Sequence, residues 1–302
     1  MKPQKVLDHG YVKYVAHMGS DEDIVSAARM STGKGFVSWE PYERCEKCGT
    51  TAELIPNITN STLHRDRCGG QIAQSKGDAG LLEYLYKMKH HTPFEMCELA
   101  VEVKAPIFVF RELVRHRTFS LNEMSARYTQ MPNEHYVPAL DRFAPKQTGN
   151  KQADSAQPAR VLAEPEELQL SVAREQEGAY DMYESMLAAG VPKEVARINT
   201  PVSRYSVMRW KANLRNWLQM FTLRDHHAAQ WECQQTVKPI VEIARALFPR
   251  TIALWEEHTK YAVTLSRSEV EEMKELLRGG KRMPREEERG ELLSEGFLGK
   301  FK

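Results

Sequence analysis

The sequence lacks several features that would each assign the chain to a broad class. No apolar run approaches the length of a membrane span, and the first residues lead into no apolar stretch of the kind that a secretory signal needs. Neither of the common Gly-rich nucleotide loops is present. We therefore expect a cytoplasmic protein without a membrane segment, in which any phosphate-bearing ligand is held by side chains and helix ends.

The chain also has almost no net charge. Its 302 residues contain 42 Lys and Arg against 41 Asp and Glu, which gives a formal net charge of +1. A general binder of nucleic acid or of membrane surfaces would be basic overall. Both partners are therefore disfavoured, and local basic clusters are expected to bind local anions.

The apolar pattern predicts an α+β fold, a central mixed or antiparallel sheet covered by helices, with no Rossmann unit. Leu99, Val101 and Val103 alternate with charged residues, as in a half-buried strand, and Trp217 and Phe221 share one face of a predicted helix. Strands do not alternate strictly with helices, which argues against a doubly wound parallel sheet. We predict one catalytic domain over residues 1–265, interrupted by an insertion at about 34–76 and followed by a charged tail over 266–302.

Residues 106–130 combine a predicted helix with a polar segment. The helix is predicted to begin at Pro106 and to end in the basic triplet at 115–117, where cationic side chains can fan out around an anion. The segment from Ser120 to Arg127 has almost no aliphatic residue and is predicted to be a loop. Ser120 and Glu123 also fit a capping box that would begin another helix, and the arginines could equally be surface charge or a nucleic-acid patch.

These residues carry a resemblance to a known family. Arg115-His116-Arg117, then seven residues, then Ser125 is similar to the signature of the flavin-dependent thymidylate synthases, and the phrase His-x-Thr-Pro-Phe-Glu at 90–95 also resembles that family. The resemblance spans residue 6 to about 262, apart from the insertion. It implies a methyltransferase of nucleotide biosynthesis that converts deoxyuridine monophosphate (dUMP) to thymidine monophosphate (dTMP).

The resemblance also implies the cofactors and the assembly. FAD would be the flavin, NADPH would recharge it, and methylenetetrahydrofolate would supply the carbon. The enzyme would be a homotetramer with its sites at subunit junctions.

Individual roles follow from the same resemblance. Arg224 would be the catalytic residue, lying over the uracil edge. The residues implied to bind the substrate are Glu112, Arg115, Glu123, Ser125, Arg127, Arg197 and Arg224. The residues implied to bind the flavin are Ser31, His90, Thr92, Glu95, Arg115, His116, Arg117, Glu123, Asn213, Arg215 and Gln219.

Some positions depart from the family pattern. Glu112 stands where the family often has Gln, and a carboxylate cannot donate the hydrogen bonds that an amide can. Gln219 stands where an Asn is expected. The family's His after Arg224 is displaced by one residue, so neither His226 nor His227 is assigned. A related protein that binds nucleotide without turnover therefore stays an alternative.

Cysteine is scarce, and its placement is informative. The insertion contains Cys45-x2-Cys48, then fifteen residues, then His64-x3-Cys68. This spacing favours one structural zinc ion bound by these residues, in a segment with too few apolar residues to order itself. A solvated loop with reduced thiols and the zinc ribbon of a nucleic-acid-binding protein are the alternatives.

The remaining cysteines suit no catalytic role. A thymidylate synthase without flavin needs a cysteine thiolate that attacks the uracil ring. Cys97 opens a predicted strand, and Cys233 lies in an apolar helix where a small buried residue is expected. The cysteines therefore agree with a flavin route.

Overall fold

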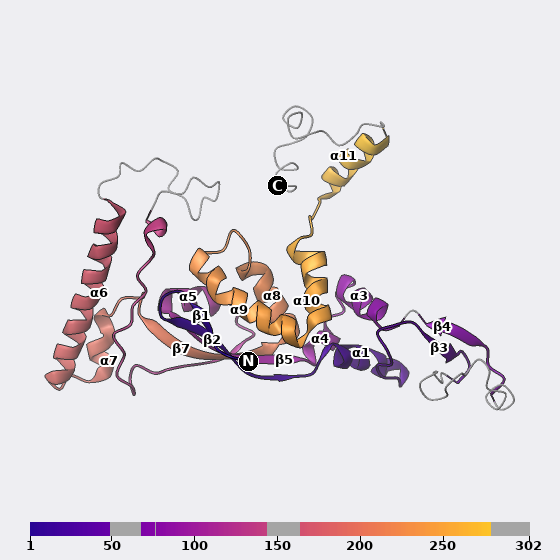
Figure 1. The fold of residues 1–302 in the computed structure, drawn as a ribbon, viewed down its shortest axis with the longest axis horizontal. Helices are drawn as coiled ribbons and strands as arrows, with labels where there is room; N and C mark the ends of the chain where they lie inside the picture. The colour runs from indigo at the N-terminus through magenta and orange to yellow at the C-terminus, as the bar shows by residue number, and fades with distance from the viewer. Residues whose placement is uncertain (49–67, 76, 144–163, 279–302) are drawn as a thin grey trace. The chain divides into compact units, whose positions relative to one another are not determined.

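The structure is a computed structural model that describes residues 1–48, 68–75, 77–143 and 164–278 (Figure 1). The chain divides into two compact units, residues 1–252 and 253–302. No helix in these described ranges is both long enough and apolar enough to cross a membrane. The predicted domain limit at residue 265 stays a prediction.

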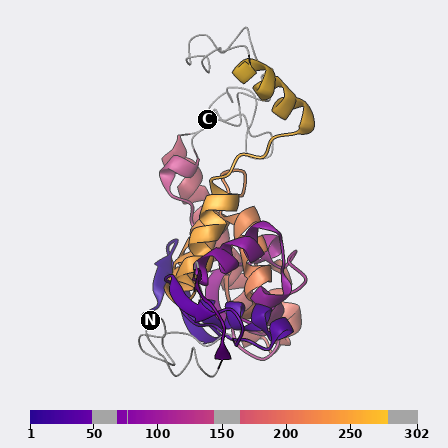
Figure 2. The ribbon, with the colours of Figure 1, turned by 90° about the vertical axis from the view of Figure 1, so that its right-hand side faces the viewer.

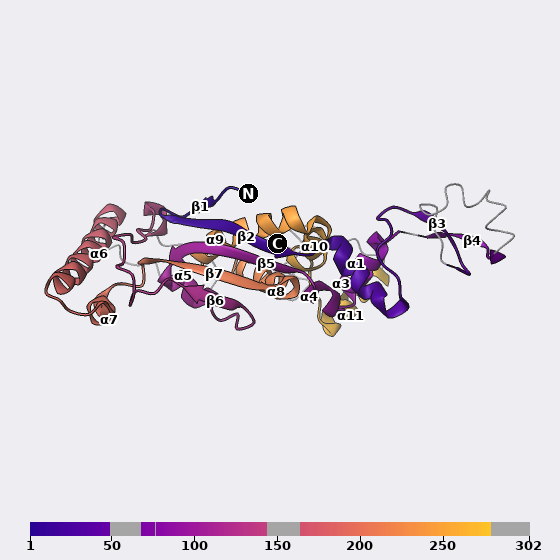
Figure 3. The same ribbon diagram turned by 90° about the horizontal axis from the view of Figure 1, so that it is seen from below.

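A five-stranded sheet forms the centre of the first unit, with the strand order β1-β2-β5-β7-β6. Every neighbouring pair in it is antiparallel, which confirms the predicted α+β class in its antiparallel form. Figure 3 shows these strands side by side. The strands are β1 (Gln4–Val6), β2 (Gly10–Met18), β5 (Glu98–Pro106), β6 (Ser120–Glu123) and β7 (Tyr205–Asn213).

The two faces of this sheet differ in chemistry. The alternating apolar residues of β5 are fully buried on the face that α8 (Leu214–Arg224) and α9 (Trp231–Leu247) cover (Figure 1, Figure 2). The other face carries cross-strand ion pairs, such as Lys211 with Glu98 and Arg209 with Glu102, each at 2.7 Å. The period-two pattern therefore predicted which side of β5 is buried.

Aromatic residues fill the space between the sheet and α8. Trp217 on α8 and Trp210 on β7 are almost completely buried, and Phe119 packs edge-on against Trp217 with ring centroids 4.7 Å apart. The indole N–H of Trp217 donates to the carbonyl oxygen of Leu99 at 3.0 Å. This confirms Trp217, and Phe221 beside it, as core residues.

Each unit contains further helical segments. In the first unit they are α1 (Asp21–Arg29), η1 (Met30–Thr32), α3 (Ala79–Lys87), α4 (Thr92–Glu95), α5 (Ile107–Leu113), η3 (Leu140–Arg142), α6 (Pro165–Ala188), α7 (Lys193–Ala196) and η4 (Arg197–Asn199). Helix α10 (Pro249–Trp255) crosses the division between the units. The second unit contains the π-helical segment η5 (Glu256–Lys260) and α11 (Arg267–Arg278).

One local prediction was wrong. The segment from Ser120 to Glu123 is neither a loop nor the start of a helix but strand β6, which pairs with β7. Backbone hydrogen bonds to the free edge of β7 form this strand, and its exposed polar side chains leave no alternating pattern to detect. Outside the named strands, His135 and Arg204 form an isolated antiparallel bridge.

The insertion forms a separate two-stranded antiparallel sheet. Strand β3 (Tyr42–Cys45) pairs with β4 (Ile72–Ser75), with Cys45 opposite Ile72. The predicted zinc ligand His64 lies outside the described residues. The described part of the insertion is therefore a hairpin stem with three of its four predicted ligands.

Candidate active site

A pocket of about 360 Å³ opens between α5, the end of β6, η4 and β7. Its apolar wall includes Phe110 and Met208. The polar residues that line it are Arg111, Glu123, Ser125, Arg197 and Arg204. Three of the predicted substrate residues are thus brought together, since Arg197 lies beside Glu123 and Ser125 although it is far from them in the sequence.

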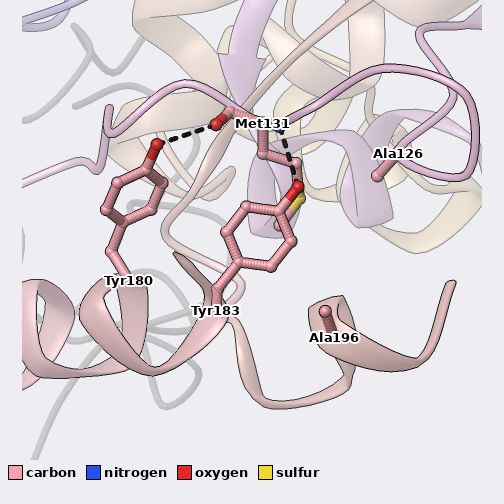
Figure 4. Packing of buried hydrophobic residues seen from close by; sticks show 5 residues of the cluster. All are labelled: Ala126, Met131, Tyr180, Tyr183 and Ala196. Atoms are coloured by element: carbon pink, nitrogen blue, oxygen red, sulfur yellow. Dashed lines mark hydrogen bonds between the residues drawn. The ribbon is translucent and has the colours of Figure 1, made fainter. Parts of the chain in front are cut away.

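A small apolar cluster positions two of those residues. Ala126 and Ala196 are buried together with Met131, Tyr180 and Tyr183 (Figure 4). The Tyr180 hydroxyl donates to the Met131 carbonyl and the Met131 N–H donates to the Tyr183 hydroxyl, both at 3.1 Å. Because Ala126 follows Ser125 and Ala196 precedes Arg197, helix α6 fixes the backbone on both sides of the pocket.

Arg111 and Arg204 line the pocket although the sequence did not single them out, and of the two Arg111 is exposed whereas Arg204 is buried. Arg204 is only 6% exposed, its Nη1 donates to the Tyr205 carbonyl at 3.3 Å, and its Nε–H has no hydrogen-bond partner in the structure. Burial lowers the pKa of its guanidinium, and nearby Arg197 acts in the same direction while Glu123 opposes it. A buried cation with an unused donor is costly unless a ligand completes it.

No sequence signal marked Arg204 for this role, because it lies at the start of a strand and outside the matched motifs. From the sequence alone, an arginine next to an apolar strand is expected to be an ordinary exposed residue. Only the closure of η4 and β7 around it makes it part of the pocket.

A second cluster joins Arg224 to residues more than a hundred positions earlier. The Arg224 Nη1 donates to a carboxylate oxygen of Glu112 and Nη2 to the Glu112 carbonyl, both at 2.9 Å. The Nε donates to Nε2 of His116 at 3.2 Å. The Glu that replaces the family's Gln is therefore a direct ion-pair partner of Arg224.

His116 is neutral in this arrangement. Its Nε2 accepts from Arg224, and burial, with the nearby Arg224 charge, lowers the pKa of its imidazole. The side chain of Arg224 is 19% exposed while that of Glu112 is 44% exposed. The guanidinium is thus held from one side and remains accessible from the other.

The basic triplet lies in the turn between α5 and β6. Arg115 and Arg117 are exposed and have no acidic partner among the described residues. Phe119, packed against Trp217, anchors the chain immediately after them. The triplet is therefore a fixed turn that presents unpaired cations to solvent.

The other predicted flavin residues gather where β5 begins and β7 ends. Glu98 pairs in register with Asn213, which brings the 90–95 phrase beside the start of α8. Glu95 bonds Arg215 at 2.8 Å, and the Asn213 side chain caps α8 by accepting from the Asn216 N–H at 3.0 Å. Two sequence phrases more than a hundred residues apart therefore form one surface.

Several of the flavin candidates are solvent-exposed. His90, Thr92, Gln219 and Ser31 are all exposed, and the Ser31 hydroxyl donates to the Ala28 carbonyl at 3.1 Å. Their amide, hydroxyl and imidazole groups, with the free cations of the triplet, match the acceptors of a flavin dinucleotide. The hydrogen-bond donors of these residues therefore suit a flavin dinucleotide.

Arg127 does not line the pocket. It is exposed and pairs with Glu194 at 2.7 Å. Its predicted substrate contact stays a prediction.

The two cysteines of the core are unsuited to nucleophilic attack. Cys97 and Cys233 are buried, and burial raises the pKa of each thiol to about 12. Almost no thiolate exists at neutral pH with such a value. The other three cysteines have their sulfur atoms within 4.8 Å of one another in the insertion.

Comparisons with known proteins identify the family of the chain. The family model described as "Thymidylate synthase complementing protein" matches residues 13–250. The flavin-dependent thymidylate synthase of Anaplasma marginale (strain St. Maries) is 35% identical over 278 residues, covering 92% of this chain and 82% of that relative. The enzyme of the same name from Gluconobacter oxydans (strain 621H) is 34% identical over 284 residues, covering 92% of this chain and 80% of its own length.

A solved structure shares the fold. The UMP/dUMP methylase PolB from Streptomyces cacaoi, bound with 5-Br dUMP, superposes with a TM-score of 0.61 at 25% sequence identity, covering 84% of this chain and 97% of that one. The chain therefore belongs to the family of flavin-dependent thymidylate synthases.

Proposed function

We propose that this protein methylates dUMP to dTMP with FAD as its flavin cofactor. The observation that carries the proposal is the pocket in which Ser125, Arg197 and buried Arg204 meet. Two guanidinium forks and a hydroxyl are the donors that a nucleotide phosphate requires. Family membership supports the chemistry.

Glu123 gives the pocket an acceptor beside these donors. A carboxylate in the same pocket would repel a phosphate placed directly against it, but accepts well from a sugar hydroxyl or from the uracil imide N–H. A pocket with both donors and an acceptor suits a nucleoside monophosphate, which offers a phosphate together with hydroxyl and N–H groups.

Arg224 is the group that would act on the uracil oxygens. A guanidinium has five N–H donors, and Glu112 and His116 use three of them, which leaves one on each Nη nitrogen. Those two can meet a uracil oxygen while the other three hold the fork in place. Glu112 is then a positioning residue, which gives the departure from the family's Gln a role.

The flavin would be held by Arg115, His116, Arg117 and Arg215, together with the exposed groups around α4. When bound, FAD supplies hydride after reduction by NADPH, and methylenetetrahydrofolate supplies the one-carbon unit. The chain itself contributes positioning and stabilisation of charge on the uracil oxygens.

A homotetramer with sites at subunit junctions is part of the proposal. Much of the flavin set lies exposed on one chain, beside exposed apolar side chains such as Met30 and Met96. A second subunit would cover both the exposed flavin residues and these apolar side chains. Native mass spectrometry tests this directly, and a monomer at micromolar concentration that still turns over would contradict it.

The activity is tested by tritium release from [5-³H]dUMP with FAD, NADPH and methylenetetrahydrofolate, with dTMP measured in parallel. We expect release that depends on each component, and slower or no release with labelled UMP. Protein that binds FAD and dUMP without tritium release would show a binding protein without turnover. Colourless protein that takes up no FAD would contradict the flavin assignment. A structural zinc ion in the insertion is a separate proposal, because it depends on the cysteines alone.

A further inference from the structure

We propose that Cys45, Cys48 and Cys68 form a structural zinc site that closes the β3–β4 hairpin. Their sulfur atoms all lie within 4.8 Å of one another, and those of Cys45 and Cys68 are 3.6 Å apart. Tetrahedral zinc with Zn–S bonds of about 2.3 Å places its sulfur ligands about 3.8 Å apart. The Cys45 and Cys68 sulfurs therefore already have the spacing of two zinc ligands, and the Cys48 sulfur lies within 4.8 Å of both.

The backbone around the sulfurs is shaped for close approach. Gly69 has a φ of +62°, and a Cβ atom added at Gly70 would lie 2.4 Å from the Cys45 sulfur and 2.7 Å from Cβ of Lys47. The N–H of Glu46 donates to the carbonyl of Gln71 at 2.8 Å, which joins the segment that carries Cys45 and Cys48 to the segment that carries Cys68. Only glycine fits at residue 70, because the chain there passes directly against the first sulfur.

A disulfide does not account for this arrangement. None of the five cysteines forms a disulfide, and the 3.6 Å between the Cys45 and Cys68 sulfur atoms is far longer than the about 2.0 Å of a sulfur–sulfur bond. Three thiolates form a soft donor set that selects zinc over magnesium or calcium. The described residues supply these three ligands, and the proposal concerns those three.

The energetics of the hairpin also call for a metal. Two strands alone are at best marginally stable in water, and β3 and β4 pair with no third strand in the part of the chain that the structure describes. Cys45 is only 1% exposed although it lies in a segment of charged and polar residues. A bound metal supplies the stabilisation that apolar burial does not provide here.

The base of the hairpin is fastened independently of the sulfurs. Asp78 is fully buried, forms an ion pair with Arg29, and accepts from the Val37 N–H at 2.8 Å. Loss of the metal should therefore loosen the hairpin and leave its attachment to α1 in place. The zinc site is structural, at the end of the insertion away from these contacts.

The first test is metal analysis of the full-length, untagged protein purified in reductant without chelator. We expect about one equivalent of zinc per chain, and less than a tenth of an equivalent in the double variant Cys45→Ser with Cys48→Ser. Glu46→Ser, between the two ligands, is the matched control and should keep the parent's zinc. Equal zinc in the parent and the double variant would overturn the proposal.

A second test needs no variant, so it does not depend on the double variant folding. Replacement of zinc by Co²⁺ should give the visible absorption bands of tetrahedral thiolate coordination. A strong chelator should raise the number of thiols that react rapidly in the native protein by three. Zinc below a tenth of an equivalent with no Co²⁺ bands, or iron in place of zinc, would contradict the assignment.

Discussion

The two arginine-rich regions of this protein differ in how their charge is balanced. In the pocket beside β6, Arg204 is buried with an unused Nε–H, and Arg197 has no ion pair among the described residues. In the other region, Arg224 is bonded three times, to Glu112 and His116. In the first region the arginines have hydrogen-bond donors that no described protein group uses. In the second region, protein contacts already hold the Arg224 guanidinium in place before a ligand binds. Binding affinity should therefore depend on the first region and the chemical step on the second.

The largest expected effect is that of Arg224→Ala. It removes a cationic contact to a ligand oxygen, a loss on the order of 2–4 kcal/mol, so dTMP formation should fall at least tenfold. The fold should survive, because Arg224 ends α8 outside the aromatic core. The measurement is kcat by tritium release, with circular dichroism as a check of folding.

Arg245→Ala is the matched control, since Arg245 is on the neighbouring helix α9 and pairs with Glu242 on the surface. It should behave like the parent. Parent-like turnover by Arg224→Ala would mean that Arg224 has no role in the reaction.

Arg204→Met should separate binding from stability. An apolar side chain of similar length removes the buried unsatisfied donor, so the free energy of unfolding should stay the same or rise. The Kd for dUMP should increase about tenfold, the cost of one charged hydrogen bond. Calorimetric titration and thermal unfolding measure the two quantities.

Arg209→Met is the control for that variant, because Arg209 lies on β7, the strand that directly follows Arg204, but is exposed and paired with Glu102. Its dUMP affinity should be unchanged. If Arg204→Met binds dUMP as the parent does, the pocket is not the nucleotide site.

Glu112→Gln should have a smaller effect than Glu112→Ala. The amide keeps an oxygen that accepts from Arg224, and an ion pair with a partner as exposed as Glu112 contributes only about 0.2–1 kcal/mol. Activity should therefore stay within about fivefold of the parent. The Ala variant releases the guanidinium, and kcat should fall more than KM changes. Equal kcat for the two variants would show that Glu112 does not position Arg224.

The smallest effect expected is on the pH dependence of stability. His135 is buried, neither ring nitrogen has a partner, and burial, together with Arg204, lowers the pKa of its imidazole below the ordinary 6.5. The unfolded chain then takes up a proton that the folded protein resists, so stability is full above about pH 6.5 and is lost as the pH falls.

His135→Phe should reduce this loss, measured as the difference in unfolding free energy between pH 7.5 and pH 5.5. His227→Phe, an exposed position, should keep the parent's difference. Arg204→Met should also reduce the loss, since it removes one of the causes. The same pH difference in His135→Phe and parent would assign the acid sensitivity to other groups.

Sequence patterns predicted much of the fold for a simple reason. In β5 and α8 the order of apolar and polar residues shows which side of the strand or helix packs against the core. The sequence of strand β6 has no such pattern, because its side chains are exposed and only its backbone is paired. The prediction failed where the stabilising contacts involve no side chain.

The same division holds for the sites. The sequence by itself determined the family, through a basic triplet and a serine at fixed spacing, and it determined which cysteines could share a metal. Tertiary structure decided that Glu112 pairs with Arg224, that Arg204 joins the pocket, and that three sulfurs lie within 4.8 Å. Motifs within one element follow from local spacing, whereas these contacts join residues far apart in the chain and exist only once the strands and helices have packed.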